Sequence, residues 1–504
     1  MIQQSQEQLR QWLERAAPGE RVYLIGAGGC GMSGLGHLFL DIGFKVFGSD
    51  IQNNIEAEEL RARGAVIHQG HDAAHLDEAQ PSLVVYSSAV KPENPELRRA
   101  VEKGLPVARR AVALAALCSR QRGVCVAGMH GKTTTSAWLA WCLEQIGADA
   151  SYAIGWRMLQ LKPHARYKTT GGAQPPWFVV EADESDGTLG QYRPHFAIVL
   201  NLDEEHLDYF GDFETICRQF KQFAARAQGG VVYCRDDERL SELLSGVAGA
   251  VSYGFHPLAD YRLEARLCRR PPGPAEKVSD NHEAIPACFE VWHERRRLGE
   301  FQTVLRGEHN ISNAGAVIAT LHQMGYTAQQ IAPAVASFLG AARRQEELYR
   351  DGRFRVFDDY GHHPREIRAT LRAMRAMKPR RLLVAFQPHR YTRTRDLLED
   401  FAKSLAEADR LWLMEIYPAS EPAIPGINSE LLAKAVRKHG KAAEVVACPE
   451  ELSCRVREVM QPGDLALFLG AGADITIAGH ALARKLREER AGDAAIVRPV
   501  EAAG

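Results

Sequence analysis

The chain has 504 residues, of which 45% are hydrophobic and 25% charged, and its formal net charge is −1. This length predicts roughly three domains of about 150 residues each. The near-zero charge gives no electrostatic case for binding nucleic acid or an anionic membrane, and no apolar run approaches the ~20 residues of a membrane-spanning helix.

Ten cysteines are scattered along the chain, and none forms a C-x-x-C pair. Several lie in apolar runs, where free cysteines are usually buried, so we expect thiols in a reducing compartment and no disulfide framework. Residues 1–17 are rich in Gln, Glu and Arg and lack the apolar core of a signal peptide. We therefore expect a cytoplasmic protein.

The first domain is predicted from a strand at 21–25, a glycine run at 26–34, a helical pattern at 35–40 and a strand at 45–48 that ends in Ser49-Asp50. This is the outline of a dinucleotide-binding βαβ unit, with a diphosphate on the helix N-terminus and Asp50 accepting from a ribose or base. Taken alone the glycine run is a weak signal, because tight packing of a helix on a strand also explains it. A further strand at 83–86 ends in Ser87-Ser88, where an open α/β sheet binds ligand.

The second domain is predicted to begin with a phosphate-binding loop at 124–135. A β-branched run leads into Gly128-Met-His-Gly131, then Lys132 and three threonines, and an apolar helical pattern follows. Glycines let the backbone approach a polyphosphate, the lysine adds a charge and a threonine hydroxyl can hold Mg²⁺. Only two residues separate the two glycines, where the usual loop has four. The alternative is a lysine at an ordinary strand-to-helix turn.

Two acidic strand ends follow in the same domain. The strand at 177–180 runs into four acids within residues 181–186, and the strand at 196–200 runs into 201–208, which contains His206. Beside a phosphate loop, such acids favour Mg²⁺ ligation, although a solvated acidic turn is the alternative. His206 is a metal ligand or a base, whereas a lone histidine is more often structural.

Residues 268–285 are rich in proline and charge, and we expect a mobile surface insertion there. The segment after it opens an alanine-rich helix with Asn310 and Asn313 near its start. These asparagines are either helix caps or contacts to a base.

The third domain repeats the order of apolar strand, polar end and helix, with strands at 354–357, 381–386, 411–416, 444–446 and 465–469. The loop after the second of these strands carries His389, Arg390, Arg393 and Arg395. Such a cluster suits a carboxylate or phosphate, because arginine binds these anions in a two-pronged way. The alternative is a surface loop paired with nearby acids. We expect a disordered tail from Ala491.

Together these patterns predict an α/β protein of three domains: a Rossmann-like N-terminal domain (1–120), a central P-loop mononucleotide-binding domain (121–342) and a C-terminal Rossmann-like domain (343–504). The joint interpretation is an ATP-driven enzyme that activates a carboxylate by phosphoryl transfer and lets an amine attack it. Chemistry of this kind depends on positioning and charge neutralisation. The sites lie on different domains, so we expect domain closure.

Four motifs then carry a resemblance: Gly-Met-His-Gly-Lys-Thr-Thr-Thr at 128–135, Glu-Ala-Asp-Glu-Ser-Asp at 181–186, Asp-Asp-Tyr-Gly-His-His-Pro at 358–364 and the arginine-rich segment at 386–396. With the glycine run at 26–34, the chain resembles the Mur ligases, the ATP-dependent amino-acid ligases of peptidoglycan precursor synthesis. The similarity extends from about residue 20 to about residue 485. The 386–396 segment makes the chain most similar to the members that add L-alanine.

The resemblance implies that the lactyl carboxylate of UDP-N-acetylmuramate attacks ATP to give an acyl phosphate, which the amine of L-alanine then attacks. The implied substrates are these three small molecules, with Mg²⁺ as cofactor, and we expect a monomer or weak homodimer. The UDP-sugar would be bound by residues of the glycine run and nearby strand ends, namely Gly28, Gly29, Gly31, Ser33, Ser49, Asp50, His71 and Ser87. Alanine and the reacting carboxylates would be surrounded by Tyr360, His362, His389, Arg390 and Arg393.

The resemblance also implies an ATP site, with catalytic roles for Lys132, His206, His362 and Arg390. ATP would be held by residues of the phosphate loop and four others, namely Gly128, His130, Gly131, Lys132, Thr133, Thr134, Asn310 or Asn313 at adenine, Arg344 near the phosphates and Asp359 near the ribose. Magnesium would be bound by Thr133 or its neighbour, Glu181 and His206.

Three departures from the family pattern stand out. Met129 replaces the usual threonine, Gln345 stands where phenylalanine is usual, and 268–285 is longer than usual. The second leaves open which of Arg343 and Arg344 contacts phosphate, and none removes a catalytic side chain. The competing hypotheses are a dehydrogenase, a nucleotide-binding regulator without turnover, and a family member specific for glycine, serine or a peptide.

Overall fold

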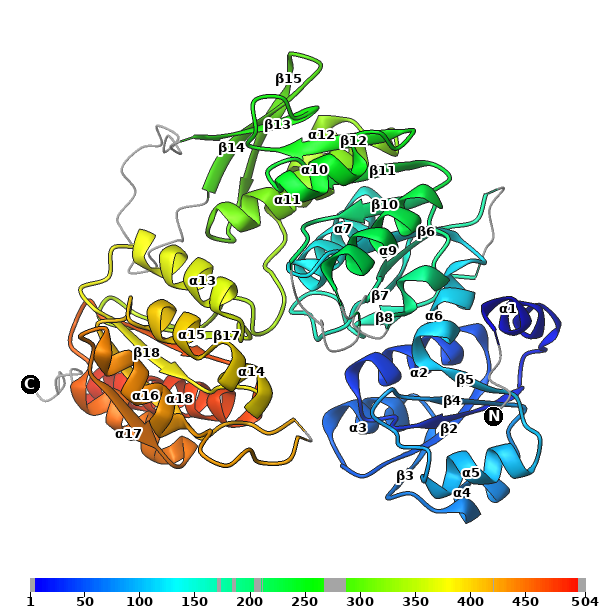
Figure 1. Cartoon of the computed structure of the whole chain (residues 1–504), viewed down its shortest axis with the longest axis horizontal. Coiled ribbons are helices and arrows are strands. Elements are labelled where there is room, and N and C mark those ends of the chain that lie inside the picture. The colour runs from blue at the N-terminus through cyan, green and yellow to red at the C-terminus, as the bar shows by residue number, and fades with distance from the viewer. Residues whose placement is uncertain are drawn as a thin grey trace, which may run out of the picture. The chain divides into compact units, whose positions relative to one another are not determined.

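The computed structural model describes residues 5–169, 174–183, 187–203, 210, 212–266, 287–419 and 421–496, without the side chains of 492–496. It separates into two compact units (Figure 1). The first unit comprises Met1–Cys268, Pro286–Val304 and Asn310–Ala341, and the second Arg269–Ile285, Leu305–His309 and Ala342–Gly504. No helix in the described part is long and apolar enough to cross a membrane.

Three sheets, two in the first unit and one in the second, confirm the predicted α/β class with three domains. The exact boundaries at 120 and 342 stay predictions.

The first sheet is parallel, with strand order β3-β2-β1-β4-β5. Its strands are β1 (Arg21–Ile25), β2 (Lys45–Asp50), β3 (Val66–Gln69), β4 (Leu83–Tyr86) and β5 (Val107–Arg109). The helices are α1 (Gln6–Arg15), α2 (Cys30–Ile42), α3 (Ile55–Ala62), α4 (Ala73–Ala79), α5 (Pro95–Glu102) and α6 (Arg110–Cys118). The strand order reverses between β1 and β4, which is where an open parallel sheet binds ligands.

The central sheet has ten strands, in the order β15-β14-β13-β12-β11-β10-β6-β9-β7-β8. They are β6 (Arg122–Ala127), β7 (Ser151–Ala153), β8 (Ala165–Arg166), β9 (Trp177–Glu181), β10 (Phe196–Val199), β11 (Gly230–Cys234), β12 (Ala250–Gly254), β13 (Tyr261–Arg266), β14 (Ala287–His293) and β15 (Arg296–Thr303). Helical segments between them are α7 (Lys132–Ile146), the 3-10 turn η1 (Thr188–Gln191), α9 (Phe213–Ala225), α10 (Glu238–Leu244), α11 (Glu308–Gln323) and α12 (Ala328–Ala336). Strand β6, which precedes the phosphate loop, pairs in parallel with β9 and β10, so their three ends meet at one edge.

The third sheet has the order β16-β17-β21-β18-β19-β20, and only the edge strand β16 is antiparallel. The strands are β16 (Glu346–Arg350), β17 (Arg355–Asp359), β18 (Leu382–Phe386), β19 (Arg410–Met414), β20 (Ala443–Val446) and β21 (Leu465–Leu469). The helices are α13 (Pro364–Ala376), α14 (Tyr391–Asp396), α15 (Leu398–Leu405), α16 (Ser429–Lys438), α17 (Pro449–Val459) and α18 (Ala473–Ile496).

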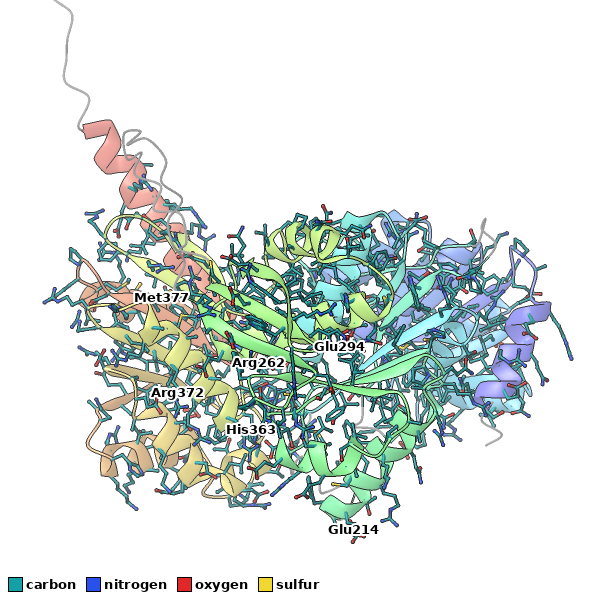
Figure 2. The ribbon with its side chains drawn as sticks, turned by 90° about the horizontal axis from the view of Figure 1, so that it is seen from above. Glu214, Arg262, Glu294, His363, Arg372 and Met377 are labelled. Atoms are coloured by element: carbon teal, nitrogen blue, oxygen red, sulfur yellow. The ribbon has the colours of Figure 1, made fainter. Side chains whose placement is uncertain are left out.

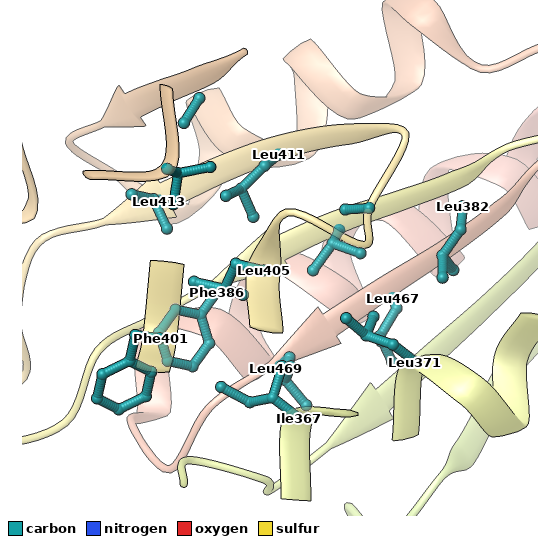
Figure 3. Packing of buried hydrophobic residues seen from close by; sticks show 14 of the residues in the cluster. Ile367, Leu371, Leu382, Phe386, Phe401, Leu405, Leu411, Leu413, Leu467 and Leu469 are labelled. Carbon is teal, nitrogen blue, oxygen red and sulfur yellow. The ribbon is translucent and has the colours of Figure 1, made fainter. Parts of the chain in front are cut away.

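Two apolar clusters cover the two faces of this third sheet. One packs α13, α15 and α16 against it (Figure 3), and the other packs α17 and α18. In the first cluster the rings of Phe386 on β18 and Phe401 on α15 lie 5.6 Å apart, centroid to centroid. Burying side chains of this size contributes roughly 2 kcal/mol each. The sheet is therefore packed on both faces, and the ends of its strands hold the site residues that follow them in position.

Three expectations need correction or comment. Helix α18 continues to Ile496, so the disorder expected from Ala491 is wrong for residues 491–496, where three alanines favour the helix although Gly492 and Asp493 do not. Cys288 is disulfide-bonded, which the sequence did not predict, whereas eight other cysteines of the described part are free. The predicted insertion at 268–285 lies outside the described residues.

The strands β13 to β15 extend the central sheet beyond the predicted elements. In β13 the buried Tyr261 and Leu263 alternate with Arg262 and Glu264, which is the period-two signal of a strand. Arg262, labelled in Figure 2, lies with its guanidinium carbon 5.5 Å from the centroid of the Trp292 ring on β14. Because charged residues alternate with the buried ones, the strands β13 to β15 were not recognised from the sequence.

Candidate functional site

The glycine turn after β1 is held by side chains from the next βα connection. The backbone N–H of Gly28 donates to Asp50 Oδ2 at 2.8 Å, and Asn54 Nδ2 donates to the Gly28 carbonyl at 2.8 Å. A Cβ on Gly28 would lie 2.9 Å from both side chains, so any larger residue would have to displace them. Helix α2 then begins without a side-chain cap, which leaves its N-terminal N–H groups for an anion.

Several residues predicted to bind the UDP-sugar already have internal partners. Asp50 holds the turn through Oδ2, and Ser33 donates to the Cys30 carbonyl at 3.0 Å. Ser49 is fully buried, and its hydroxyl donates to Glu96 at 2.5 Å. Direct contacts from these side chains to a ligand stay predictions, and their observed role is to shape the turn.

The remaining predicted residues of this region lie at the same sheet edge. Ser87 follows β4, and its N–H donates to the Ile25 carbonyl at the end of β1. His71 follows β3, with its Nδ1 2.9 Å from Ser49 Oγ. Glu96, which sequence reasoning missed, joins them from α5. The Asn94-Pro95 pair indicates a helix start. Nothing in the neighbouring sequence, however, shows that the residue after it, Glu96, is fully buried.

The phosphate loop between β6 and α7 has the backbone that its sequence predicts. Gly128 and Gly131 have φ of +136° and +85°, in the region that favours glycine. Asn201, at the end of β10, clamps the loop by accepting from the His130 N–H at 2.8 Å and donating to the His130 carbonyl at 2.9 Å. Lys132 Nζ donates to the Gly128 carbonyl at 2.6 Å, so the ammonium lies over the loop. Asn201 was missed as a functional residue, because its partner is 71 positions away.

Glu181, at the end of β9, accepts hydrogen bonds from the phosphate loop region and from the segment after β7. Its Oε1 accepts from the Gly155 N–H at 2.9 Å and its Oε2 from Thr133 Oγ1 at 3.3 Å. Burial raises the pKa of this carboxyl, and the hydrogen bond from Gly155 and the charge of Lys132 lower it. A carboxylate and a hydroxyl oxygen are ligands that suit Mg²⁺, so these residues fit the predicted metal. His206, the third predicted ligand, lies outside the described residues.

The two asparagines predicted to reach adenine lie on α11 in the first unit. Both are nearly buried, and Asn313 Nδ2 donates to Asn310 Oδ1 at 3.4 Å. A Cβ on Gly131 would lie 2.8 Å from Asn313 Oδ1, so Asn313 lies against the phosphate loop. The structure thus brings this asparagine to the loop, and its contact with adenine stays a prediction. Thr134, on the first turn of α7, is also nearly buried.

In the second unit, the ends of β17 and β18 bring the predicted alanine-site residues together. The His362 ring lies 5.4 Å from Tyr360 and 5.6 Å from His389, centroid to centroid. Arg393 Nη1 lies 3.4 Å from His389 Nδ1. Burial lowers the pKa of His362 to about 4, and burial together with the neighbouring His362 and arginines lowers the pKa of His389 to about 3. Both imidazoles are therefore neutral at pH 7.

Arg390, at φ +72°, is held by Tyr417 and Glu421, which sequence reasoning did not connect with the site. Its N–H donates to the Tyr417 carbonyl at 2.8 Å, and its guanidinium lies 3.9 Å from Glu421. The Tyr417 ring stacks on His389 at 5.5 Å with an interplanar angle of 10°. Arg395 pairs with the neighbouring Asp396 at 2.7 Å, as the alternative of a surface loop paired with acids predicts for it. Binding of an anion by Arg390 and Arg393 stays a prediction.

The neighbouring arginines at the start of the second unit have different environments. Arg343 is 8% exposed, donates to the carbonyls of Gly470 and Gly472, and lies 3.3 Å from the buried Asp358. Arg344 has a side chain 30% exposed, with Glu366 at 3.8 Å. Arg344 is thus the better placed of the two to meet a ligand, which supports the predicted choice.

Asp359, predicted near the ribose, is 5% exposed and accepts from the N–H groups of Gln345 and Gly361, each at 2.8 Å. Burial raises the pKa of its carboxyl. Its observed role is to fix the turn after β17, and its contact with ribose stays a prediction.

Comparison with known proteins covers nearly the whole chain. Three family models match: Mur ligase family, catalytic domain, at residues 21–122; Mur ligase middle domain at 126–321; and Mur ligase, glutamate ligase domain, at 343–472. The chain is 37% identical to the UDP-N-acetylmuramate–L-alanine ligase of Carboxydothermus hydrogenoformans over 467 residues, which is 92% of this chain and 96% of that one. It is 38% identical to the enzyme of the same name from Stenotrophomonas maltophilia over 479 residues, covering 93% and 95%.

Solved structures agree with these matches. The UDP-N-acetylmuramate-alanine ligase MurC of Thermotoga maritima superposes with a TM-score of 0.76 at 27% identity, covering 93% of this chain and 99% of that one. A murein peptide ligase of Psychrobacter arcticus shares the fold, with a TM-score of 0.65 at 23% identity over 92% and 98% of the two chains.

Proposed function

Because the chain belongs to the Mur ligase family, we propose that it is an ATP-dependent ligase that joins UDP-N-acetylmuramate to L-alanine in peptidoglycan precursor synthesis. The observation that carries this proposal is the 37–38% identity to ligases of that name over more than 90% of both chains. The products are UDP-N-acetylmuramoyl-L-alanine, ADP and phosphate.

The chemistry proceeds in two displacements. An oxygen of the lactyl carboxylate attacks the γ-phosphorus of ATP, ADP leaves, and an acyl phosphate forms. The neutral amine nitrogen of L-alanine then attacks the acyl carbon, and the tetrahedral intermediate expels phosphate as the nitrogen loses one proton and keeps the other in the amide. Both displacements concentrate negative charge, so positioned cations account for most of the rate.

The residues of the chain have distinct parts in these steps. Lys132 leaves the Gly128 carbonyl to neutralise phosphate charge, while the N–H groups at the uncapped start of α7 bind phosphate oxygens. Thr133 and Glu181 would hold Mg²⁺, which when bound neutralises phosphate charge and orients the transferred group. In the second unit, Arg390 and Arg393 suit a carboxylate, and the neutral His362 can accept a hydrogen bond from an amine.

The test is phosphate release from ATP with each component omitted in turn. We expect release only when UDP-N-acetylmuramate, an amino acid and Mg²⁺ are all present, with L-alanine preferred. Equal rates with D-glutamate would contradict the alanine assignment. ATP binding without turnover would support the regulator, and an absorbance change of a nicotinamide cofactor would support the dehydrogenase.

A matched pair of lysine variants tests the loop. Lys132→Ala should abolish phosphate release and leave binding of the UDP-sugar intact, because the glycine turn lies on another sheet. Lys168→Ala, a surface lysine paired with Asp149 at 2.8 Å, is the control and should keep full activity. Loss of UDP-sugar binding in Lys132→Ala would give this loop a different role.

We further propose a cytoplasmic monomer or weak homodimer that acts on small molecules and binds neither nucleic acid nor membrane. The net charge of −1 supports the absence of polyanionic partners. Sedimentation at micromolar concentration tests the oligomeric state, and a stable tetramer would contradict it.

A further inference from the structure

A fully buried carboxylate lies beneath the ligand edge of the first sheet. Glu96 has no exposed surface, although it is in the first turn of the surface helix α5. Its two oxygens are approached by five groups from four parts of the domain, namely Tyr23 Oη, Ser49 Oγ, His71 Nδ1, the Asp72 N–H and His75 Nδ1. A buried charge is stable only where such partners are supplied, so this is an organised network.

The hydrogen-bond inventory of the network determines where its protons lie. Tyr23 Oη donates to Glu96 Oε1 at 2.8 Å, and burial together with the Glu96 charge raises the pKa of Tyr23, which keeps it a donor. Ser49 has one hydroxyl proton, which it donates to Glu96 Oε2 at 2.5 Å. The oxygen of Ser49 can then only accept from its other neighbour.

That other neighbour is the Nδ1 atom of His71. It lies 2.9 Å from Ser49 Oγ and 3.1 Å from Glu96 Oε2, and both of these atoms are acceptors. Nδ1 must therefore carry a proton. In the neutral imidazole the opposite nitrogen, Nε2, then presents a lone pair.

The position of His71 makes this lone pair relevant to ligand binding. His71 follows β3, and its partner Ser49 directly precedes Asp50, which holds the glycine turn through Gly28. The His71 side chain keeps 16% of its surface exposed, although its Nδ1 belongs to the buried network. All of these residues lie at the carboxyl edge of the parallel sheet, where its ligand binds.

We propose that Glu96 is a positioning residue which fixes the Nδ1–H tautomer of His71, so that the neutral imidazole accepts the imide N–H of a uracil base at Nε2. Uracil carries a proton on N3, whereas cytosine has a lone pair there, which would face the lone pair of His71 Nε2. With cytosine bound, its N3 and His71 Nε2 would face each other as two acceptors without a proton between them. This contact disfavours cytosine relative to uracil. The network thus selects uridine over cytidine nucleotides. This inference rests on the proposed function, since it assumes a UDP-sugar substrate.

The test compares the binding of UDP and CDP to the full-length protein by calorimetry. We expect the wild type to bind UDP at least about tenfold more tightly than CDP, which corresponds to about 1.4 kcal/mol. In Glu96→Gln the amide can donate to Nδ1, which frees the His71 proton to move to Nε2. The UDP-to-CDP preference should then fall about tenfold, while ATP affinity stays unchanged.

Glu102→Gln is the matched control, because Glu102 is on the same helix with a side chain 59% exposed. It should keep the wild-type preference. If Glu96→Gln does not fold, His71→Gln keeps the buried carboxylate and provides a side chain that can donate or accept, so it too should lose the preference. A ¹⁵N spectrum of the histidines in the wild type should show His71 protonated at Nδ1.

Three results would overturn the inference: equal binding of UDP and CDP by the wild type, an unchanged preference in a folded Glu96→Gln and in His71→Gln, or a His71 with its lone pair on Nδ1. The nucleotide preference is measured without turnover. Failure of phosphate release with UDP-N-acetylmuramate would therefore count against the proposed function alone.

Discussion

Thr133 Oγ1 lies 3.3 Å from Glu181 Oε2, which joins the first turn of α7 to the end of β9. The two residues are 48 positions apart, and they meet because β6 and β9 are parallel neighbours whose ends share one edge. A hydroxyl and a carboxylate are thus placed together beside the phosphate loop. This pair is the structural basis of the predicted magnesium site.

The first prediction concerns Thr133→Val, which removes the hydroxyl and keeps the shape. We expect the apparent Mg²⁺ affinity, measured by titration of phosphate release, to fall roughly 10- to 100-fold. Thr135→Val is the control, because Thr135 is buried on the same helix and its Oγ1 has no partner in the described part of the chain. If both variants showed the same magnesium dependence, Thr133 would not be a ligand.

The second prediction compares the two glycines that flank helix α7. Gly131 and Gly147 have φ of +85° and +82°, so alanine should cost each about 1 kcal/mol in the free energy of unfolding. Only at Gly131 does a new Cβ meet a neighbour, Asn313 Oδ1 at 2.8 Å, whereas nothing lies within 4 Å at Gly147. Gly131→Ala should therefore weaken ATP binding by more than about tenfold, measured by calorimetry, and Gly147→Ala should not. Equal loss of ATP affinity would mean that backbone strain alone is responsible.

The third prediction separates Arg343 from Arg344. Arg343→Ala should lower the free energy of unfolding by about 3 kcal/mol, because it removes the ion-pair partner of the buried Asp358 and the donor to two backbone carbonyls. Arg344→Ala should change stability by less than about 0.5 kcal/mol and lower kcat/KM for ATP. Denaturant unfolding and steady-state kinetics measure the two effects. The opposite pattern would assign the ligand contact to Arg343.

The fourth prediction concerns pH. The pKa of His389 is about 3 in the folded protein and 6.5 as its ordinary value, lowered by burial and by His362, Arg393 and Arg390. Between these values the unfolded chain binds a proton that the folded chain does not, so stability falls as pH decreases from 6.5 towards 3. One such histidine contributes at most about 1.4 kcal/mol per pH unit.

His389→Gln should accordingly flatten the dependence of the unfolding temperature on pH between 6.5 and 4. His439→Gln, on the surface beside Glu399 at 2.9 Å, is the control for removing a histidine. An unchanged slope in His389→Gln would show that His389 does not titrate differently in the two states.

Much of the site was predictable from short segments. The loop at 128–135 needs a strand, glycines at two positions with positive φ, a lysine and a helix start, and these requirements are met by neighbours in the chain. The alternation of apolar strands and polar ends likewise predicted three α/β domains, because burial on both faces of a parallel strand requires a continuous apolar run. Local physics was sufficient in these cases.

The contacts that support the site were not predictable in this way. Asn201 clamps His130 across 71 positions, and Glu96 reaches Ser49 across 47. The choice between Arg343 and Arg344 also depends on which one faces Gly470 and Asp358. Such partners are set by the order and register of strands, which no short segment encodes.

The sequence by itself determined which backbone turns can bind phosphate and which side chains could do chemistry. Only the tertiary structure decided which of these side chains face a ligand and which are held by buried partners, because a hydrogen bond needs two groups within about 3 Å and strand order brings them there.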